Sequence, residues 1–258
     1  MKNKIIFDVG AYDGIDGLAL AIKNPKCTVY AFEANPVLFE KINYNKLKIE
    51  KRIGKRISNY KVINKAVSNI DKQGDFLISK NPTGSSLKEF SKNLDESWPG
   101  YRELHFHTVK KINIEIVTLE KFCIENNIRF INYLHIDTQG NDLNVFKGLG
   151  KFQDKVKEGN LEAAVNKENA LYVDNHTVED VKIFFESTGY RIKKISPIDS
   201  NIKHEVNVYF ENKKFIDSYK MNTNYKSRYF FRVIASKTYI KDDIRDFFLR
   251  ILNFFLLR

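Results

Sequence analysis

Two segments near the start of the chain, KIIFDVGAYDG at 4–14 and VYAFEANP at 29–36, constrain its fold more than any other feature. In each, an apolar run typical of a buried strand leads into polar residues, Asp8 and Gly10 in the first and Glu33 in the second. A glycine turn lets the backbone approach a ligand, and a carboxylate after the second strand can accept both hydroxyls of a ribose. The two segments predict a nucleotide-like cofactor at the first two strands of a Rossmann-like sheet.

The sequence of the first turn narrows the kind of cofactor. A dinucleotide fingerprint needs a glycine two positions after Gly10, and Tyr12 at that place would crowd a diphosphate. The pattern D-x-G-x-x-x-G, with Asp8, Gly10 and Gly14, suits a ligand without phosphates, such as S-adenosylmethionine, whose amino-acid end carries an ammonium group. Nearby acidic residues favour a cation, and no Walker phosphate loop is present. The alternative is a tight strand-to-helix turn with Asp13 as the helix cap.

Composition limits the partners and the compartment. The chain has 258 residues, 43% of them hydrophobic, which fits one large domain or one domain with an appendage. A net charge of +11 permits an anionic partner, but the lysines are spread out without an arginine-rich tract, so nucleic acid is not favoured. Cys27 and Cys123 have no C-x-x-C partner and indicate buried thiols in a reducing, cytoplasmic setting. Asp8 interrupts any signal-peptide-like apolar segment, and no stretch is long enough to span a membrane.

Strand-like and helix-like segments alternate, which is typical of a parallel α/β sheet. The apolar patterns predict strands at 4–9, 28–33, 60–68, 75–80, 114–117, 161–166, 191–198 and 205–212. They also predict an apolar strand within 131–140 that ends in a polar loop. They predict helices at 15–23, 36–48, 118–127, 143–152 and 177–190, with Pro36, Thr118 and Thr177 at helix starts. The polar segment 81–107 is expected to be a long loop over the ligand edge of the sheet.

The last part of the chain differs from the rest. Residues 241–258 have a helical pattern whose apolar face carries Ile244, Phe247, Phe248, Ile251, Leu252 and Phe255. This helix is expected to pack on the core or on a second copy of the chain, or to lie in a membrane interface as a peripheral anchor. We therefore divide the chain into a domain at 1–215 and a basic, amphipathic C-terminal extension at 216–258.

A third motif, LHIDTQGNDLNVFKGL at 134–149, completes a set that resembles the FkbM family of S-adenosylmethionine-dependent methyltransferases. Members of that family carry D-x-x-G-x-[ED]-L after the fourth strand, followed by a helix that ends in K-G. The matching residues here are Asp137, Gly140, Asp142, Leu143, Lys147 and Gly148. Weaker matches include Leu171–Tyr172, and the resemblance extends over about 4–212.

The resemblance implies a class I methyltransferase fold, with a mostly parallel seven-stranded sheet and an antiparallel last strand. It implies methyl transfer from S-adenosylmethionine to a hydroxyl of a small-molecule or glycan acceptor, such as a sugar or a secondary metabolite. It places Asp8 and Gly10 at the methionine end of the cofactor, Glu33 at the ribose, and Asp137 and Gln139 at the methyl group or acceptor. The remaining cofactor-binding residues expected on this basis are Ala11, Asp13, Gly14 and Asn35.

The sequence departs from the family at a position that affects catalysis. Many members have Glu two positions after the motif's Asp, where this chain has Gln139, which can orient a hydroxyl but cannot take its proton. Asp137 is therefore the first candidate for the base and His135 the second, although His135 alternates with Leu134 and Ile136 as a packed core residue would. Gln139 also leaves open a non-catalytic binding or scaffold module with the same fold.

Two further groups of residues could contact ligands. His105 and His107 alternate on an expected strand and would share one face, but without a third ligand no metal site is predicted. Lys80, Lys88 and Lys92 lie in or beside the long loop and suggest an anionic acceptor as a hypothesis.

Overall fold

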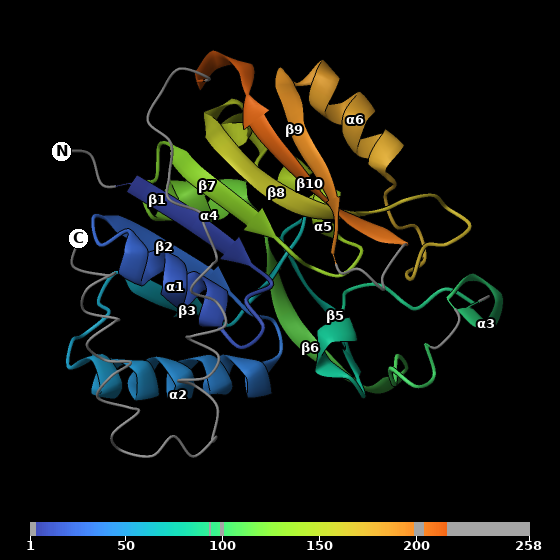
Figure 1. Ribbon diagram of the computed structural model, residues 1–258, viewed down its shortest axis with the longest axis horizontal. Coiled ribbons are helices and arrows are strands. Elements are labelled where there is room, and N and C mark those ends of the chain that lie inside the picture. The colour runs from blue at the N-terminus through green and yellow to red at the C-terminus, as the bar shows by residue number, and fades with distance from the viewer. Residues whose placement is uncertain (1–3, 93, 99–100, 199–203, 216–258) are drawn as a thin grey trace.

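Seven strands form the main sheet, in the order β3-β2-β1-β7-β8-β10-β9 (Figure 1). The computed structural model describes residues 4–92, 94–98, 101–198 and 204–215 of the chain. The strands of this sheet are β1 (Lys4–Val9), β2 (Cys27–Phe32), β3 (Tyr60–Ile63), β7 (Ile131–Ile136), β8 (Val156–Ala164), β9 (Tyr190–Pro197) and β10 (Glu205–Asn212). Strand β10 runs antiparallel to both of its neighbours, β8 and β9, and the pairs formed by β3, β2, β1, β7 and β8 are parallel. This confirms the predicted mostly parallel sheet with an antiparallel last strand. The predicted helix at 241–258 and the whole extension at 216–258 lie outside the described residues.

A second, three-stranded sheet was not predicted. It consists of β4 (Ala66–Val67), β6 (Thr108–Val117) and β5 (Lys72–Ser79), in that order. The predicted single strand at 60–68 is wrong, because the chain turns after Ile63 and its next residues pair with β6 instead. Asn64 holds that turn, since its side-chain amide donates to the carbonyls of Glu33 and Ala34 at 2.8 and 3.2 Å. The small sheet therefore starts directly beside the end of β2.

The predicted long loop contains short helices. A 3₁₀ helix, η1 (Pro82–Gly84), and a one-turn helix, α3 (Leu94–Ser97), lie within it. Backbone hydrogen bonds fasten this segment to the rest of the domain: the amide of Leu77 donates to Ser86 at 2.8 Å, and that of Val173 to Glu89 at 2.9 Å. The segment is thus attached both to β5 and to the chain after β8.

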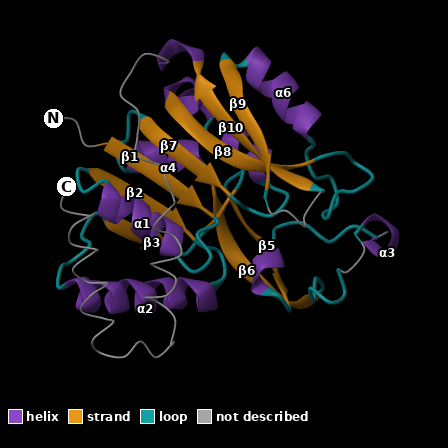
Figure 2. Cartoon of the chain, in the orientation of Figure 1, coloured by secondary structure: helices purple, strands orange, loops and turns teal. Residues whose placement is uncertain are grey.

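Helices cover both faces of the main sheet (Figure 2). One face packs against α1 (Ile15–Lys23) and α2 (Pro36–Ile53), and the other against α4 (Leu119–Glu125), α5 (Asp142–Lys147) and α6 (Val178–Ser187). Two 3₁₀ helices, η2 (Gly150–Lys155) and η3 (Lys213–Phe215), complete the described elements. The helix predicted at 143–152 is shorter than expected, since α5 ends at Lys147 with Gly148 as its C-cap, and η2 begins at Gly150, whose φ is +49°.

Side-chain caps begin the helices where the sequence predicts them. Asn35 accepts a hydrogen bond from the amide of Val37 at 3.0 Å, and Pro36 occupies the first turn of α2. Thr177 and Asp180 form a capping box at the start of α6. Thr118 caps α4 by accepting from the amide of Lys121. These caps fix the positions at which the polar loops leave the strands.

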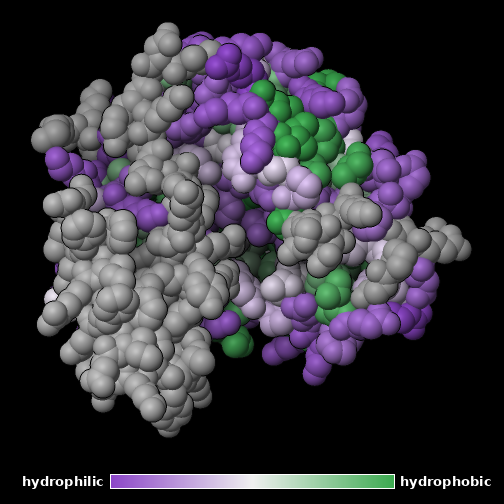
Figure 3. Space-filling model, viewed as in Figure 1, coloured by the Kyte–Doolittle hydropathy of each residue, from purple (hydrophilic) through white to green (hydrophobic). Residues whose placement is uncertain are grey.

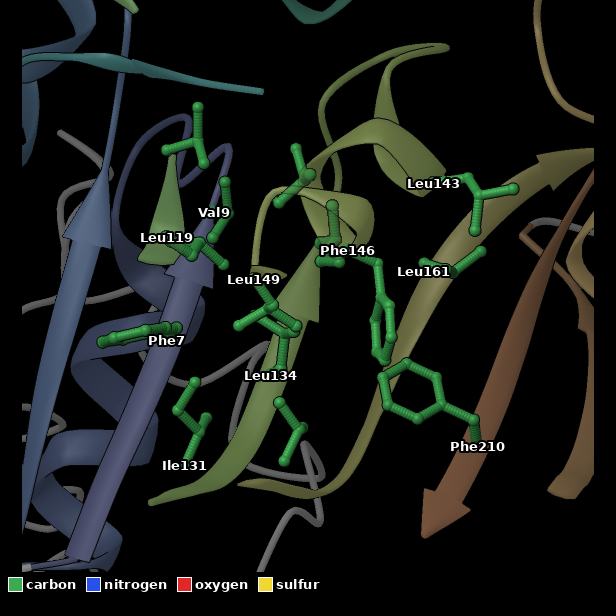
Figure 4. Packing of buried hydrophobic residues seen from close by; sticks show 14 of the residues in the cluster. Phe7, Val9, Leu119, Ile131, Leu134, Leu143, Phe146, Leu149, Leu161 and Phe210 are labelled. Atoms are coloured by element: carbon green, nitrogen blue, oxygen red, sulfur yellow. The ribbon is translucent and has the colours of Figure 1, made fainter. Parts of the chain in front are cut away.

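The larger core lies between the sheet and α4, α5 and α6 (Figure 4). Phe146 of α5 is fully buried, and its ring lies 5.0 to 5.9 Å from the rings of Phe184, Phe185, Tyr190 and Phe210. Burying an aromatic side chain of this size stabilises a fold by about 1.5–3 kcal/mol. This packing fixes α5, and with it the loop that joins α5 to β7.

The smaller core lies under α1 and α2 and includes Cys27, while Cys123 belongs to the larger one. Both cysteines are free and buried, as the sequence predicts. Among the described residues, no helix combines the length and the apolar character needed to cross a membrane.

Candidate functional site

A cavity lies at the carboxyl ends of β2, β1 and β7, which are neighbours in the sheet. Figure 3 shows a hollow at about the place where the arrowheads of β1 and β7 end in Figure 1. The cavity encloses about 620 Å³ including its open mouth. Three regions line it. The segment after β2 contributes Glu33, Ala34 and Leu38, and the surroundings of the small sheet contribute Ala66, Phe76 and Leu87. The segments after β1 and β7 contribute Gly10, Asp137, Gln139 and Asn141. Parallel α/β sheets bind ligands at this edge.

Gly10 allows the ends of these strands to meet. Its φ is +86°, and a Cβ atom at this position would lie 1.7 Å from the carbonyl oxygen of Asp137. The amide of Gly10 donates to Phe32 at 3.0 Å, and the amide of Asp137 donates to Val9 at 2.8 Å. Only glycine fits this close approach, so Gly10 sets the distance between the two polar loops of the site.

Glu33 lies in the cavity wall with its carboxylate fixed by two backbone amides. Oε2 accepts from Tyr12 and Oε1 from Asn35, each at 2.8 Å. The residue is 6% exposed, and burial raises the pKa of Glu33 to about 7, against the effect of the two amide bonds. A carboxylate has about four lone-pair sites. Glu33 can therefore accept further hydrogen bonds from a ligand in an orientation that the backbone has already set.

Asp137, Gln139 and Tyr172 are joined by hydrogen bonds, and the Tyr172 hydroxyl also lies 3.1 Å from the carbonyl oxygen of Gly84. The side-chain amide of Gln139 donates to Asp137 Oδ1 at 2.7 Å, and its oxygen accepts from the Tyr172 hydroxyl at 2.9 Å. The backbone of Gln139 is left-handed, with φ of +56°, and its carbonyl accepts from the hydroxyl of Ser86 at 2.6 Å. Asp137 Oδ2 accepts no hydrogen bond from the described residues. One carboxylate oxygen is thus held while the other remains able to accept a proton.

Tyr172 is 1% exposed and packs its ring against Gly140. Tyr172→Phe removes the hydroxyl that donates to Gln139 Oε1 and lies 3.1 Å from the carbonyl oxygen of Gly84, so we expect the free energy of unfolding to fall by about 1–3 kcal/mol. The measurement is chemical denaturation. Tyr44→Phe is the matched control, because Tyr44 is 56% exposed and its hydroxyl loss should change stability by less than about 0.5 kcal/mol. Equal effects of the two substitutions would contradict the role given to the Tyr172 hydroxyl.

Asp8 and His135 do not line this cavity; they form a pair beside it. Asp8 Oδ1 lies 2.8 Å from His135 Nδ1, and Asp8 Oδ2 is buried without a hydrogen-bond partner among the described residues. Burial alone would lower the pKa of His135, but the hydrogen bond and charge of Asp8 raise it above its ordinary value. The two side chains project to the α1 side of the sheet, opposite Leu134 and Ile136. The structure therefore places an oriented, hydrogen-bonded pair next to the site.

Four other residues expected to bind the cofactor shape the loops instead of lining this cavity. Asp13 accepts a hydrogen bond from the amide of Ile15 at 3.1 Å, at the start of α1. Gly14 has φ of +74°, and the amide of Ala11 donates to Phe32 at 2.9 Å. The side chain of Asn35 caps α2, and the backbone amide of Asn35 donates to Glu33 Oε1. These contacts hold the carboxylate and the first turn in place.

The sequence analysis missed several residues of the site. Tyr12, Thr138 and Asn141 line the cavity, and Tyr172 reaches it through Gln139. Asn141 donates its side-chain amide to the carbonyl of Val67 at 3.0 Å, which ties the small sheet to the loop after β7. The sequence signals for them were the place of Tyr12 in the first motif, of Thr138 and Asn141 in the third, and the weak match at Tyr172.

Buried carboxyl groups surround the β7 side of the site. Burial and the charge of Asp137 raise the pKa of Asp142 to about 7. Burial and the charges of Asp142 and Asp137 raise the pKa of Glu205 to about 8. Asp142 accepts from the amide of Glu162 at 3.2 Å and from the hydroxyl of Thr138 at 3.2 Å. The β7 side of the site is therefore rich in carboxyl groups, and those of Asp142 and Glu205 hold their protons up to about pH 7 and 8.

The raised pKa values predict that stability falls with rising pH. Glu33, Asp142 and Glu205 keep their protons to about pH 7, 7 and 8 in the fold, whereas an unfolded chain loses them near pH 4. The unfolded state then binds fewer protons, so the free energy of unfolding decreases as pH rises toward the folded pKa values. We expect the protein to be less stable at about pH 8.5 than at about pH 6.5 in the ligand-free state, as measured by thermal unfolding. The opposite effect of His176, whose pKa is lowered to about 4 chiefly by burial, falls mostly below this window, because an unfolded histidine loses its proton near pH 6.5.

Glu205→Gln provides the control for this prediction, because it removes the most strongly shifted of the three carboxyl groups. The variant should lose less stability over the same pH window. An unchanged slope would show that Glu205 does not hold its proton in the fold.

The described residues contain no cluster of three or more His, Cys, Asp or Glu side chains that could hold a metal ion. The strand predicted around His105 and His107 is wrong, because β6 begins only at Thr108. His105 lies in a turn with φ of +56°, and its amide donates to Arg102 at 2.9 Å. The two imidazoles therefore do not share the face of a strand.

Several solved structures are similar to this chain. Methyltransferase FkbM from Methylobacillus flagellatus KT aligns with 12% identity and a TM-score of 0.49, over 81% of this chain and 43% of its own. TrmK of M. capricolum, solved with S-adenosyl-homocysteine, aligns with 14% identity and a TM-score of 0.41, over 88% and 69%. Magnesium protoporphyrin IX methyltransferase from Synechocystis PCC 6803, solved with S-adenosylmethionine, aligns with 7% identity and a TM-score of 0.43, over 81% and 70%. The chain thus spans less than half of the first of these proteins.

No curated protein sequence matches the chain. A family model does match: the methyltransferase FkbM domain aligns with residues 8–192, which is well over half of the chain. The match runs from the aspartate of the first motif to the middle of β9 and includes Glu33, Asp137 and Tyr172. The chain belongs to the FkbM methyltransferase family.

Proposed function

We propose that this protein transfers a methyl group from S-adenosylmethionine to a hydroxyl oxygen of a sugar, a glycan or a secondary metabolite. The observation that carries the proposal is the shared cavity of Glu33 and Asp137, two carboxylates at strand ends on either side of Gly10. One is oriented by backbone amides, and the other has an oxygen that no described residue occupies.

The residues of the cavity fit S-adenosylmethionine. Glu33 offers carboxylate oxygens for the two ribose hydroxyls. Leu38, Phe76 and Leu87 provide apolar wall on the side of the small sheet, as an adenine ring requires. The turn at Gly10, with Tyr12 at the place where a dinucleotide site needs a glycine, suits a ligand without phosphate groups. When bound, this cofactor supplies an electrophilic methyl group.

The chain's own residues would orient the acceptor and take up its proton. Methyl transfer requires the acceptor oxygen, the methyl carbon and the sulfur to be collinear, so positioning supplies much of the acceleration. Asp137 Oδ2 would accept the proton of the acceptor hydroxyl, while Gln139 holds Oδ1 at 2.7 Å. Gln139 takes no proton in this scheme; its amide fixes the base, and Tyr172 fixes the amide.

A transfer assay tests the proposal. The purified protein is incubated with S-adenosylmethionine labelled in its methyl group and with a panel of monosaccharides, glycans and hydroxylated metabolites. We expect label in an ether-linked methyl group of at least one acceptor. Label found only on nitrogen or carbon, or no transfer by a protein that binds the cofactor, would contradict hydroxyl methylation. The second outcome would favour a binding module with the same fold.

A further inference from the structure

Helix α2 exposes apolar side chains on the face that it turns away from the sheet. Val37 is 75% exposed, Leu47 64% and Tyr44 56%. The opposite face packs into the smaller core through Ile42 and Ile49, which are fully buried. Helix α2 therefore packs on the core through its buried face, and the three outward apolar residues take no part in that packing.

The same helix and the turn after it concentrate positive charge. Residues 36–56 carry seven lysines and arginines against two carboxylates, Glu40 and Glu50, and Lys46 pairs with Glu50 at 2.9 Å. A net charge of +5, seven minus two, thus falls in this short stretch, which is nearly half of the +11 of the whole chain. Lys51, Lys55 and Arg56 are all exposed. The outward face of α2 combines cations and apolar side chains, and we call it the α2 face (Val37, Lys41, Tyr44, Leu47, Lys51, Lys55 and Arg56).

We propose that the α2 face docks on an anionic lipid surface. Helices that lie in a membrane interface combine basic residues, which attract anionic headgroups, with apolar residues that enter the headgroup boundary. The charge of the α2 face is complementary to such a surface. Nucleic acid would match the cations alone and would leave Val37 and Leu47 unexplained.

The α2 face lies next to the cofactor cavity. Helix α2 begins at Pro36, three residues after Glu33. Lys41 lies over the ring of Tyr12, with 5.0 Å between its nitrogen and the ring centroid, and Tyr12 lines the cavity. Docking through this face would bring the β2 side of the site close to the lipid surface. The inference does not depend on the proposed acceptor.

Vesicle cosedimentation of the full chain tests the inference. The probes are vesicles of phosphatidylcholine alone and of phosphatidylcholine with phosphatidylserine. We expect binding to the anionic vesicles that weakens in about 0.5 M NaCl, with little binding to neutral ones. The triple variant Lys51→Glu, Lys55→Glu, Arg56→Glu should bind on the order of 100-fold more weakly. Tyr44→Ser with Leu47→Ser should also weaken binding while leaving the salt dependence in place.

Matched controls are Lys110→Glu on β6 and Ile183→Ser on α6, both exposed residues on other elements. These variants should bind like the unaltered chain. Equal binding of the α2 variants and the unaltered chain would overturn the inference and assign lipid binding to another segment, such as 241–258. Equal binding to neutral vesicles, or binding to polyuridylate with no binding to anionic vesicles, would overturn it as well.

Discussion

Gly10→Ala is expected to destabilise the protein by more than about 4 kcal/mol, which leaves little of a typical domain's stability. An alanine Cβ would lie 1.7 Å from the carbonyl oxygen of Asp137, and this backbone oxygen cannot move without breaking the pairing of β1 and β7. The left-handed φ of +86° adds strain for any side chain. Chemical denaturation, followed by circular dichroism, measures the loss.

Gly189→Ala is the control that measures the strain of a left-handed alanine without the steric clash expected at position 10. Gly189 has φ of +82°, close to that of Gly10, but a Cβ there would meet no atom within 4 Å. This control should cost only about 1–2 kcal/mol, the strain of a left-handed alanine. If the two variants lost the same stability, the close approach of Gly10 to Asp137 would not be what requires the glycine.

Asp137→Asn is expected to lower the rate of methyl transfer by about 10²- to 10⁴-fold, the usual contribution of a general base. Asparagine keeps the shape of the side chain and an oxygen that can accept from Gln139, but it cannot take a proton. Cofactor affinity should change only a few-fold, since the loss concerns the acceptor. The measurement is the rate of label transfer to an acceptor identified in the assay above, together with calorimetric binding of the cofactor.

Asp154→Asn is the control for this substitution, because Asp154 lies in η2 and bonds to Lys155 away from the cavity. It should leave transfer unchanged. An Asp137→Asn variant that transfers methyl groups at the normal rate would remove Asp137 as the proton acceptor, and His135, held by Asp8, would become the next residue to test.

The parts of the fold that local sequence dictates were predicted well. Helix α1 and strand β1 have the predicted bounds, and Thr177 caps α6 as expected. The position of Glu33 and Asp137 at one edge also followed from the sequence, because parallel strands bring their carboxyl ends together. The mostly parallel seven-stranded sheet with an antiparallel last strand was implied by the family resemblance and is confirmed.

The parts that depend on long-range pairing were not predictable in this way. Strands β4 and β6 pair across about fifty residues. The local sequence pattern therefore does not show that Ala66 belongs to a different strand and sheet from β3. Tyr172 bonds to Gln139 across a separation of 33 residues. Asp8 was expected at the methionine end of the cofactor, and the structure places it beside the cavity, paired with His135. Strand periodicity shows which side chains share a face of the sheet, but it does not show which face a ligand contacts.

The most direct test of the account is calorimetric titration of the protein with S-adenosylmethionine and S-adenosylhomocysteine, for the unaltered chain and for Glu33→Gln. Glutamine has nearly the volume of glutamate but loses the charge, and it turns an amide nitrogen toward a backbone donor. Hydrogen bonds to charged groups contribute about 1.5–3 kcal/mol, so we predict binding by the unaltered chain and a loss of about 100-fold in the variant. A folded, unaltered chain that binds neither ligand, or a variant that binds them equally well, would contradict the account.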